Sequence, residues 1–87
     1  MSIKRWDAKR DANEAAIFEG LVKAGYSVQR DDWVDLVVGK GGRTFLLEVK
    51  TSWKAPVQDS QKLLLEMWRG HYKIVTTLDE ALKAVEI

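Results

Sequence analysis

Three charged residues interrupt two apolar, strand-like segments in the middle of the chain. Asp35 lies within the apolar segment 34–38, and Glu48 and Lys50 lie two residues apart within the segment 43–51. Carboxylate oxygens are the ligands that hard divalent cations prefer, and Mg²⁺ usually takes one or two of them together with water and substrate phosphate. A lysine beside such an ion can orient the attacking water or stabilise charge that develops on the phosphate. These residue types indicate Mg²⁺- or Mn²⁺-dependent hydrolysis of a phosphodiester bond.

The positions of these side chains depend on strand geometry. Glu48 and Lys50 point to the same face, because side chains alternate along a strand. One register of the glycine-rich turn pairs Val38 with Arg43. In that register Asp35 lies diagonal to Glu48, with about 7 Å between their Cβ atoms. A solvated strand face is the alternative for Glu48 and Lys50. Asp35 argues against it, because an unpaired carboxylate within an apolar strand is costly.

The periodicity of apolar residues predicts the elements that carry these side chains. Helices are expected over 7–24, from 59 or 60 to about 69, and from 77 to 85. Strands are expected over 26–30, 34–38, 43–51 and 72–75. The order α-β-β-β-α-β-α indicates an α/β fold in which helices flank a small mixed central β-sheet.

Capping residues and apolar stripes describe the helices further. Gly25 is a natural stop for the first helix, and Asp59 or Ser60 can cap the second. Helical spacing of the apolar residues then predicts which side of each helix is buried. On the first helix this stripe consists of Ala8, Ala12, Ala15, Phe18 and Val22. On the second helix it consists of Leu63, Leu64, Met67 and Trp68.

The composition limits the class of protein. With 87 residues the chain is expected to form one domain, 1–87, and because so small a core is marginally stable we expect a homodimer. Cysteine is absent, no apolar run approaches the roughly 18 residues that span a bilayer, and no signal sequence follows Met1. We therefore expect a soluble, cytoplasmic protein. The net charge is only +1, so any contact with nucleic acid must be local.

A set of short motifs resembles a known family. The residues that carry the resemblance are Asn13-Glu14, Asp35-Leu36-Val37-Val38-Gly39, Phe45-Leu46-Leu47-Glu48-Val49-Lys50, Ser60-Gln61-Lys62 and Gly70. In this order they resemble the VRR-NUC branch of the PD-(D/E)XK nuclease superfamily, in its stand-alone, virus-type form. The resemblance spans roughly residues 13–78 and implies a restriction-endonuclease-like fold. One departure is Val34, because the family usually has proline before the motif aspartate.

The resemblance implies roles for five residues. Asp35 and Glu48 would bind Mg²⁺ or Mn²⁺, and Glu14 would be a further acidic ligand or would position water. Lys50 would be the catalytic cation, and Gln61 would orient the reacting groups. The alternative for Glu14 and Gln61 is a solvated position on a helix.

The resemblance also implies a function, which is structure-selective cleavage of DNA. The expected substrate is a four-way (Holliday) junction, resolved by a two-fold dimer with two equivalent sites. A flap-selective or single-strand-selective nuclease is the alternative within the enzymes. A non-catalytic nucleic-acid-binding or assembly module on the same fold is the alternative outside them. Such a compact nuclease would suit DNA repair in a phage or prophage of a bacterial host.

Basic and aromatic residues outside the metal site are candidates for contacts with nucleic acid. These residues are Lys4, Arg5, Lys9, Arg10, Lys40, Arg43, Trp53 and Lys54. Basic side chains bind phosphates, although a solvated helix face uses them equally well. Four tryptophans are many for so small a core, and they can also stack on bases or form a subunit interface. We expect Trp68 to lie in the core and Trp53 to contact substrate or a second subunit.

Overall fold

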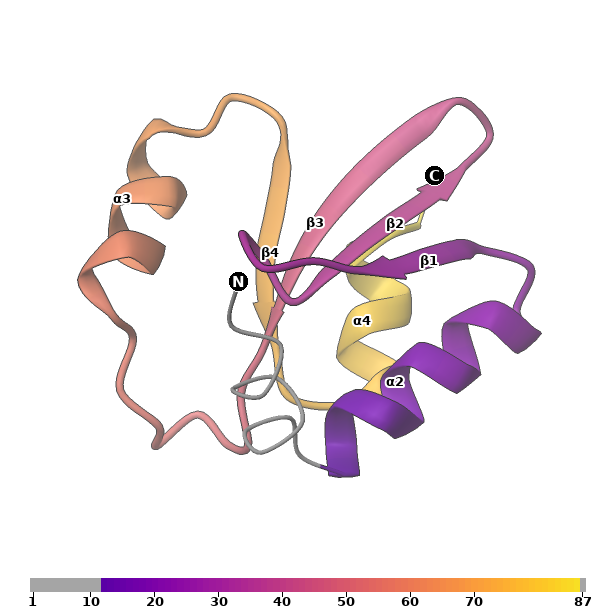
Figure 1. The fold of residues 1–87 in the computed structure, drawn as a ribbon, viewed down its shortest axis with the longest axis horizontal. Coiled ribbons are helices and arrows are strands. Elements are labelled where there is room, and N and C mark those ends of the chain that lie inside the picture. Colours follow the sequence, from indigo (N-terminus) through magenta and orange to yellow (C-terminus); the bar gives the residue numbers. More distant parts are fainter. Residues whose placement is uncertain (1–11, 87) are drawn as a thin grey trace.

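The computed structural model of the chain describes residues 12–86 (Figure 1). The helices of this part are α2 (Ala12–Lys23), α3 (Asp59–Met67) and α4 (Leu78–Ala84). The strands are β1 (Ser27–Arg30), β2 (Leu36–Lys40), β3 (Arg43–Val49) and β4 (His71–Val75). This order confirms the predicted α/β fold. None of the helices in residues 12–86 has the length and apolar character that crossing a bilayer requires.

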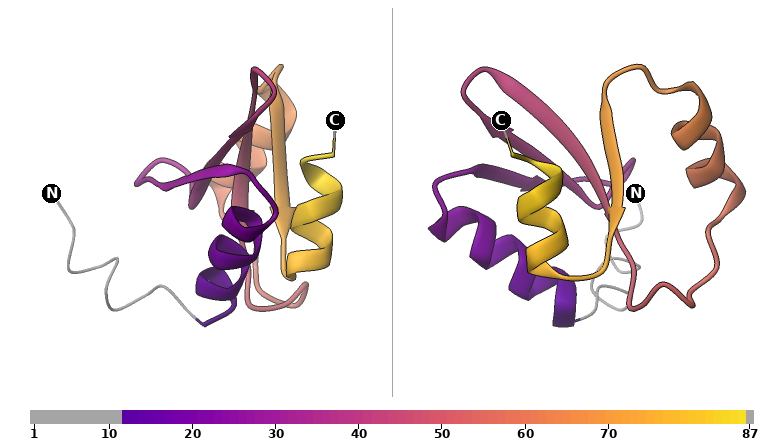
Figure 2. Two further views of the ribbon diagram at one scale, coloured as in Figure 1. Left: turned by 90° about the vertical axis from the view of Figure 1, so that its right-hand side faces the viewer. Right: turned by 180° about the vertical axis from the view of Figure 1, so that it is seen from behind.

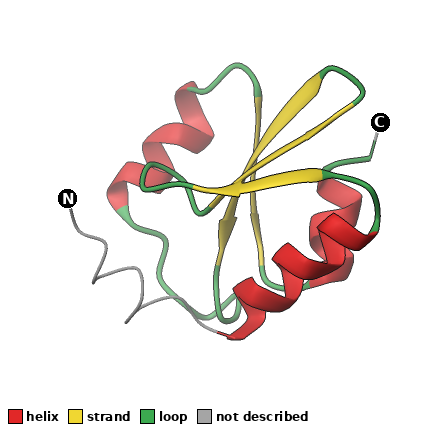
Figure 3. Ribbon diagram, turned by 45° about the vertical axis from the view of Figure 1, so that its right-hand side comes forward, coloured by secondary structure: helices red, strands yellow, loops and turns green. Residues whose placement is uncertain are grey.

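The four strands form one mixed sheet in the order β1-β2-β3-β4 (Figure 3). The first three strands are antiparallel neighbours, whereas β4 runs parallel to β3. Parallel neighbours need a crossover connection, and α3 lies within the connection that joins β3 to β4. The sheet is therefore an antiparallel meander with one parallel strand added at its edge.

One face of the sheet carries the main core. Helices α2 and α4 pack side by side against this face (Figures 1 and 2). The strands contribute the alternating residues that such a half-covered sheet requires. The buried residues of this core are Ile17, Leu21, Leu36, Val38, Phe45, Leu47, Val75, Ala81 and Val85.

The buried side of α2 differs from the predicted stripe. Ile17 and Leu21 are fully buried, whereas Val22 is 47% exposed and Ala15 is exposed. The larger side chains gain more from burial than alanine does, so they set the rotation of the helix. Glu14 consequently lies on the buried side. The predicted start of this helix and Ala8 lie outside the described residues.

The helix stop at Gly25 is confirmed. Gly25 has φ +97°, and the Tyr26 N–H donates to the Leu21 carbonyl at 3.1 Å. Together with the bond from the Gly25 N–H to the Val22 carbonyl, this is a Schellman motif, which needs a left-handed residue at this position.

The opposite face of the sheet carries a smaller core of Val34, Leu46, Tyr72 and Ile74. Helix α3 lies beyond the β4 edge and has no buried residue (Figure 1). Only Leu64 of this helix packs against the small core. The predicted burial of Leu63, Met67 and Trp68 is wrong, because these side chains are 56%, 65% and 42% exposed. Their apolar surface has no sheet face to cover, since α3 lies beside an edge strand.

The β2–β3 hairpin closes with a shorter turn than predicted. Lys40 pairs with Arg43 across Gly41 and Gly42, which have φ +61° and +78°. Two consecutive residues with positive φ are typical of the type I′ turn, whose twist matches that of the strands. The predicted pairing of Val38 with Arg43 is wrong by two residues. Because the error is an even number, every side chain keeps its predicted face.

Substitutions at the two adjacent glycines of the hairpin turn are expected to change the free energy of unfolding in opposite directions. Gly42→Ala is expected to lower the free energy of unfolding by about 1 kcal/mol, because the added Cβ meets no atom within 4 Å and only the positive φ opposes it. Gly41→Asn is expected to raise it by about 0.5 kcal/mol, because asparagine tolerates positive φ and restricts the unfolded chain. Urea unfolding of the two variants measures both effects. Destabilisation by both substitutions would contradict the type I′ assignment.

Candidate functional site

Asp35 and Glu48 form a carboxylate pair at the end of the β2–β3 hairpin. Leu36 pairs with Leu47, so continuing the register by one residue places Asp35 directly opposite Glu48. The Val49 N–H donates to Asp35 Oδ2 at 2.7 Å. The predicted diagonal arrangement is corrected to a direct one, and the predicted convergence of the carboxylates is present.

The electrostatics of the pair follow from its burial. Glu48 is only 5% exposed. Burial raises the pKa of Glu48 to about 7, and the negative charge of Asp35 acts in the same direction. Two ionised carboxylates on neighbouring positions repel each other, and each can only accept hydrogen bonds. The pair therefore needs either a proton or a cation to offset its mutual repulsion.

Tyr72 adds a polar group beside this pair. It is buried in β4, and its hydroxyl makes no hydrogen bond of standard geometry within residues 12–86. Burial raises the pKa of Tyr72, and the adjacent Glu48 charge raises it further. The Tyr72 hydroxyl stabilises the ionised form of Glu48 and so lowers its pKa, but this effect only partly offsets the rise that burial causes. Tyr72 thus stays a neutral donor next to the carboxylates, a role that the alternation of apolar residues in the sequence conceals.

The donor set of the pair fits a hard divalent cation. Asp35 and Glu48 present carboxylate oxygens, which Mg²⁺ and Mn²⁺ prefer to nitrogen or sulfur. Within residues 12–86 no group of three or more His, Cys, Asp or Glu side chains could hold a metal ion. The structure therefore supplies two ligands, within the one or two carboxylates that Mg²⁺ commonly takes from a protein.

Lys50 follows the pair at the end of β3, where its backbone is held from two sides. Its N–H donates to the Val75 carbonyl at 2.9 Å. Its carbonyl accepts from Asn13 Nδ2 at 2.8 Å, and the same amide nitrogen donates to the Thr76 carbonyl at 3.2 Å. Asn13 thus fastens the beginning of α2 to the ends of two strands. Alternation along β3 predicts that the Lys50 side chain lies on the Glu48 side of the sheet.

Glu14 is buried, in contrast to the solvated alternative. It is 3% exposed, and its Oε2 lies 3.2 Å from Arg30 Nε. The Arg30 guanidinium carbon also lies 4.3 Å from the centre of the Phe18 ring. The structure joins Glu14 to this arginine and not to a three-residue ligand group with Asp35 and Glu48. Its role as a metal ligand stays a prediction.

Gln61 has a structural contact in addition to its predicted role. Its Oε1 accepts the Gln58 N–H at 3.1 Å, which caps the first turn of α3. Gln58 is therefore the N-cap residue, and the predicted caps Asp59 and Ser60 are wrong. The Gln61 side chain, three residues after the N-cap, accepts the backbone N–H of the N-cap residue, as in a capping box. The orienting role of Gln61 stays a prediction.

Two of the basic residues predicted to bind nucleic acid lie far from the carboxylate pair. Lys40 and Arg43 lie at the hairpin tip, about 15 Å along the strands from Asp35 and Glu48. Lys40 Nζ lies 4.7 Å from the centre of the Tyr26 ring. Lys54 is exposed in the loop after β3. The remaining predicted contacts, Lys4, Arg5, Lys9 and Arg10, lie outside the described residues.

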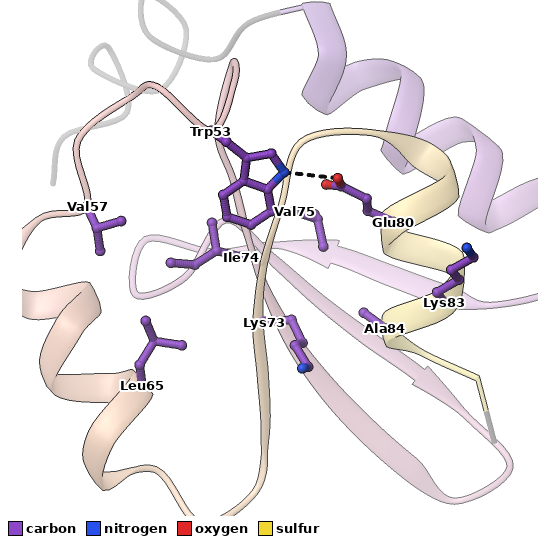
Figure 4. Close-up of a pocket in the computed structure, with 9 residues that line it drawn as sticks. All are labelled: Trp53, Val57, Leu65, Lys73, Ile74, Val75, Glu80, Lys83 and Ala84. Carbon is purple, nitrogen blue, oxygen red and sulfur yellow. Dashed lines mark hydrogen bonds between the residues drawn. The ribbon is translucent and has the colours of Figure 1, made fainter.

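Trp53 lines a cavity away from the carboxylates. It is 60% exposed, and its Nε1 donates to Glu80 Oε2 at 3.0 Å (Figure 4). The cavity has a volume of about 570 Å³ and extends along the β4 edge towards α4. Neither Asp35 nor Glu48 lines it. The prediction that Trp53 contacts substrate or a second subunit stays a prediction.

Trp68 and Trp33 line a second pocket, which includes the site. Trp68 is 42% exposed, so the prediction of a core position is wrong. Its ring and that of Trp33 lie 5.2 Å apart in an edge-to-face arrangement. The pocket has a volume of about 320 Å³, and Glu48 is one of its lining residues. The sequence offered one unused signal for Trp33, its position two residues before Asp35.

Comparison of the chain with protein-family models, with curated proteins and with solved structures finds no match. The resemblance of the motifs therefore remains an expectation. The geometry of the carboxylate pair carries the functional argument.

The raised pKa of Glu48 predicts how stability depends on pH in the metal-free protein. The folded state keeps a proton up to about pH 7, whereas the unfolded chain releases it near pH 4.5. The stabilisation is therefore fully present below pH 4.5 and is lost as the pH rises to 7, by on the order of 2 to 3 kcal/mol. Urea unfolding in EDTA between pH 5 and 8 measures this loss.

Glu48→Gln is the control for this dependence, because a neutral amide of the same shape cannot titrate. We expect the fall between pH 5 and 7 to be much smaller in the variant. The same slope in wild type and variant would contradict a proton held by Glu48.

Proposed function

We propose that the protein is a metal-dependent DNA endonuclease that hydrolyses phosphodiester bonds. The observation that carries this proposal is the convergence of the half-buried Asp35 and the buried Glu48 on adjacent strands, with Lys50 two residues beyond Glu48. Like charges in a buried position lower the stability of a fold, so their presence here favours a function for the pair over a role in packing. The pattern of residues also supports membership of the VRR-NUC branch of the PD-(D/E)XK nucleases.

Each residue of the site has a distinct task in this proposal. Asp35 and Glu48 hold Mg²⁺ or Mn²⁺, which when bound activates water and neutralises charge on the phosphate. The Val49 N–H fixes the orientation of Asp35 through the 2.7 Å hydrogen bond. Lys50 orients the attacking water or stabilises the charge that develops on the phosphate oxygens. Glu48 must lose its proton before it can serve as a ligand, so activity increases as the pH rises through 7.

A non-catalytic binding module is less well supported by the same residues. Nucleic acid is polyanionic, and two carboxylates without a metal repel phosphate. A module that only binds would gain nothing from them at the substrate surface. The pair can contact phosphate only when a bound cation reverses its charge. Metal-dependent hydrolysis requires the same cation.

The proposed substrate is branched DNA, and the four-way junction implied by the resemblance is the first candidate. A chain of net charge +1 cannot hold a long duplex by counterion release alone, so shape must contribute to selectivity. A homodimer would present two equivalent sites to the two opposing strands of a junction. The proposed setting is the cytoplasm of a bacterium that carries the phage or prophage.

Cleavage and metal binding test the assignment of the pair. We expect Mn²⁺-dependent nicking of plasmid or branched DNA by the wild type, with a loss of at least 100-fold in Asp35→Asn and Glu48→Gln. Calorimetric titration with Mn²⁺ should show binding to the wild type and none to Asp35→Asn. Glu66→Gln, which removes an exposed carboxylate on α3, is the matched control. Equal Mn²⁺ binding by wild type and Asp35→Asn would exclude the pair as the metal site.

Lys50→Ala separates chemistry from binding in the same experiments. This variant should keep Mn²⁺ and DNA affinity within about threefold and lose cleavage, because the lysine acts mainly in the transition state. Lys23→Ala, at an exposed position on α2, controls for the loss of one positive charge. Cleavage within tenfold of wild type would make Lys50 a surface charge.

Competition and mass measurements test the choice of substrate. A labelled four-way junction should be cut in the presence of excess linear duplex, and light scattering at micromolar concentration should give the mass of a dimer. Charge reversal at Lys40 and Arg43 should weaken junction binding and flatten its salt dependence without changing Mn²⁺ binding. Equal cleavage of junction and linear duplex, or a monomeric mass throughout, would replace the junction nuclease with a less selective enzyme.

A further inference from the structure

The second pocket described above combines apolar walls with one acidic residue. Trp33 contributes from the loop before β2, and α3 with the residue after it contributes Ser60, Leu63, Leu64, Met67 and Trp68. Glu48 of β3 is the only charged residue among those that line this pocket. Its volume of about 320 Å³ is at the lower end of the range for sites that hold one small ligand.

The two tryptophans are held in position by local structure. The backbone N–H of Trp33 donates to Asp31 Oδ2 at 2.9 Å, and the backbone N–H of Asp31 donates to the Asp35 carbonyl at 3.4 Å. The loop that positions Trp33 therefore also positions the first carboxylate of the pair. At the other wall, a Cβ on Gly70 would lie 2.8 Å from Trp68 Nε1, so the absence of a side chain there lets the indole approach the backbone.

We propose that this pocket binds one unpaired nucleobase of the DNA strand whose phosphate lies at Asp35 and Glu48. The inference rests on the proposed function and, within branched DNA, favours a substrate with an unpaired nucleotide at the branch, such as a flap, over a fully paired four-way junction. A nucleobase has apolar faces that stack on tryptophan and a polar edge that donates N–H groups to a carboxylate. A base-paired nucleotide has its faces stacked and its Watson–Crick edge occupied, so it must leave the helix before it can enter the pocket.

The charge of the pocket distinguishes this occupant from an apolar one. An aliphatic side chain or a second apolar helix would offer the Glu48 carboxyl neither a hydrogen-bond donor nor a cation. A base with a metal-bound phosphate supplies both partners. Glu48 belongs both to the pocket and to the carboxylate pair. The base in the pocket and the phosphate at the pair would therefore belong to the same nucleotide or to adjacent ones.

DNA binding in Ca²⁺, which replaces Mg²⁺ to prevent cleavage, tests the proposal by fluorescence anisotropy. The probes are a 5′-flap, the same flap with one abasic nucleotide at the branch, and the matching linear duplex. For the flap, Trp33→Ala and Trp68→Ala should each weaken binding roughly 5- to 100-fold, because stacking contributes about 1 to 3 kcal/mol per base. Both variants should bind the duplex and the abasic flap like the wild type. Trp68→Phe should retain most of the affinity, because a phenyl ring still stacks.

Leu63→Ala and Leu65→Ala form a matched pair on α3. Both leucines are about half exposed, but Leu63 lines this pocket and Leu65 lines the other cavity. Flap affinity should fall in Leu63→Ala and should stay within twofold in Leu65→Ala. Circular dichroism and Mn²⁺ titration confirm that each variant is folded with an intact metal site.

Three outcomes would overturn the inference. Wild-type flap affinity in both tryptophan variants excludes base stacking in this pocket. An equal loss of flap and duplex binding makes the contact independent of unpaired bases. Conversion of a dimer to a monomer by Trp33→Ala, measured by light scattering, assigns the pocket to a second copy of the chain. Failure of the wild type to cut any DNA would instead contradict the proposed function and leave the binding result to stand by itself.

Discussion

The repulsion between two carboxylates in a largely apolar surface is the constraint on which the site depends. The Val49 N–H fixes Asp35, and burial together with the charge of Asp35 raises the pKa of Glu48 to about 7. The register of the hairpin brings them opposite each other, and the Gly41-Gly42 turn sets this register. A local backbone preference at the tip of the hairpin therefore determines an electrostatic arrangement about 15 Å away.

The two faces of the sheet divide stability from function. The face covered by α2 and α4 contains nine fully buried residues and supplies most of the apolar burial. The other face has a smaller core and carries the carboxylates, Tyr72 and the tryptophan pocket. Helix α3, with no buried residue, leaves this second face accessible. The imbalance explains how so short a chain can keep polar groups in its interior and still fold.

Much of the fold was predictable because it depends on local patterns. Alternation identified the strands, and the glycine after α2 identified its end. The hairpin register was not predictable from glycine content alone, because the sequence Gly39-Lys40-Gly41-Gly42 is compatible with a two-residue turn and with a four-residue turn. The buried side of α2 was predicted wrongly, because the prediction gave small alanines the same weight as larger apolar residues such as Ile17 and Leu21. Of the site, the Asp35–Glu48 pair was predictable from residue type, whereas the Glu14–Arg30 contact joins segments that no spacing rule connects.

The Asn13 amide connects segments that are 37 and 63 residues apart in the chain, at Lys50 and Thr76. The carboxylate pair, in contrast, lies within one hairpin and forms as soon as two neighbouring strands meet. Contacts between distant segments form later in folding and open earlier in local unfolding than a hairpin does. Partial opening of β4 and α4 would therefore release the backbone around Lys50 while the carboxylates stayed together. Local unfolding of this kind would separate Lys50 from the carboxylate pair before the pair itself came apart.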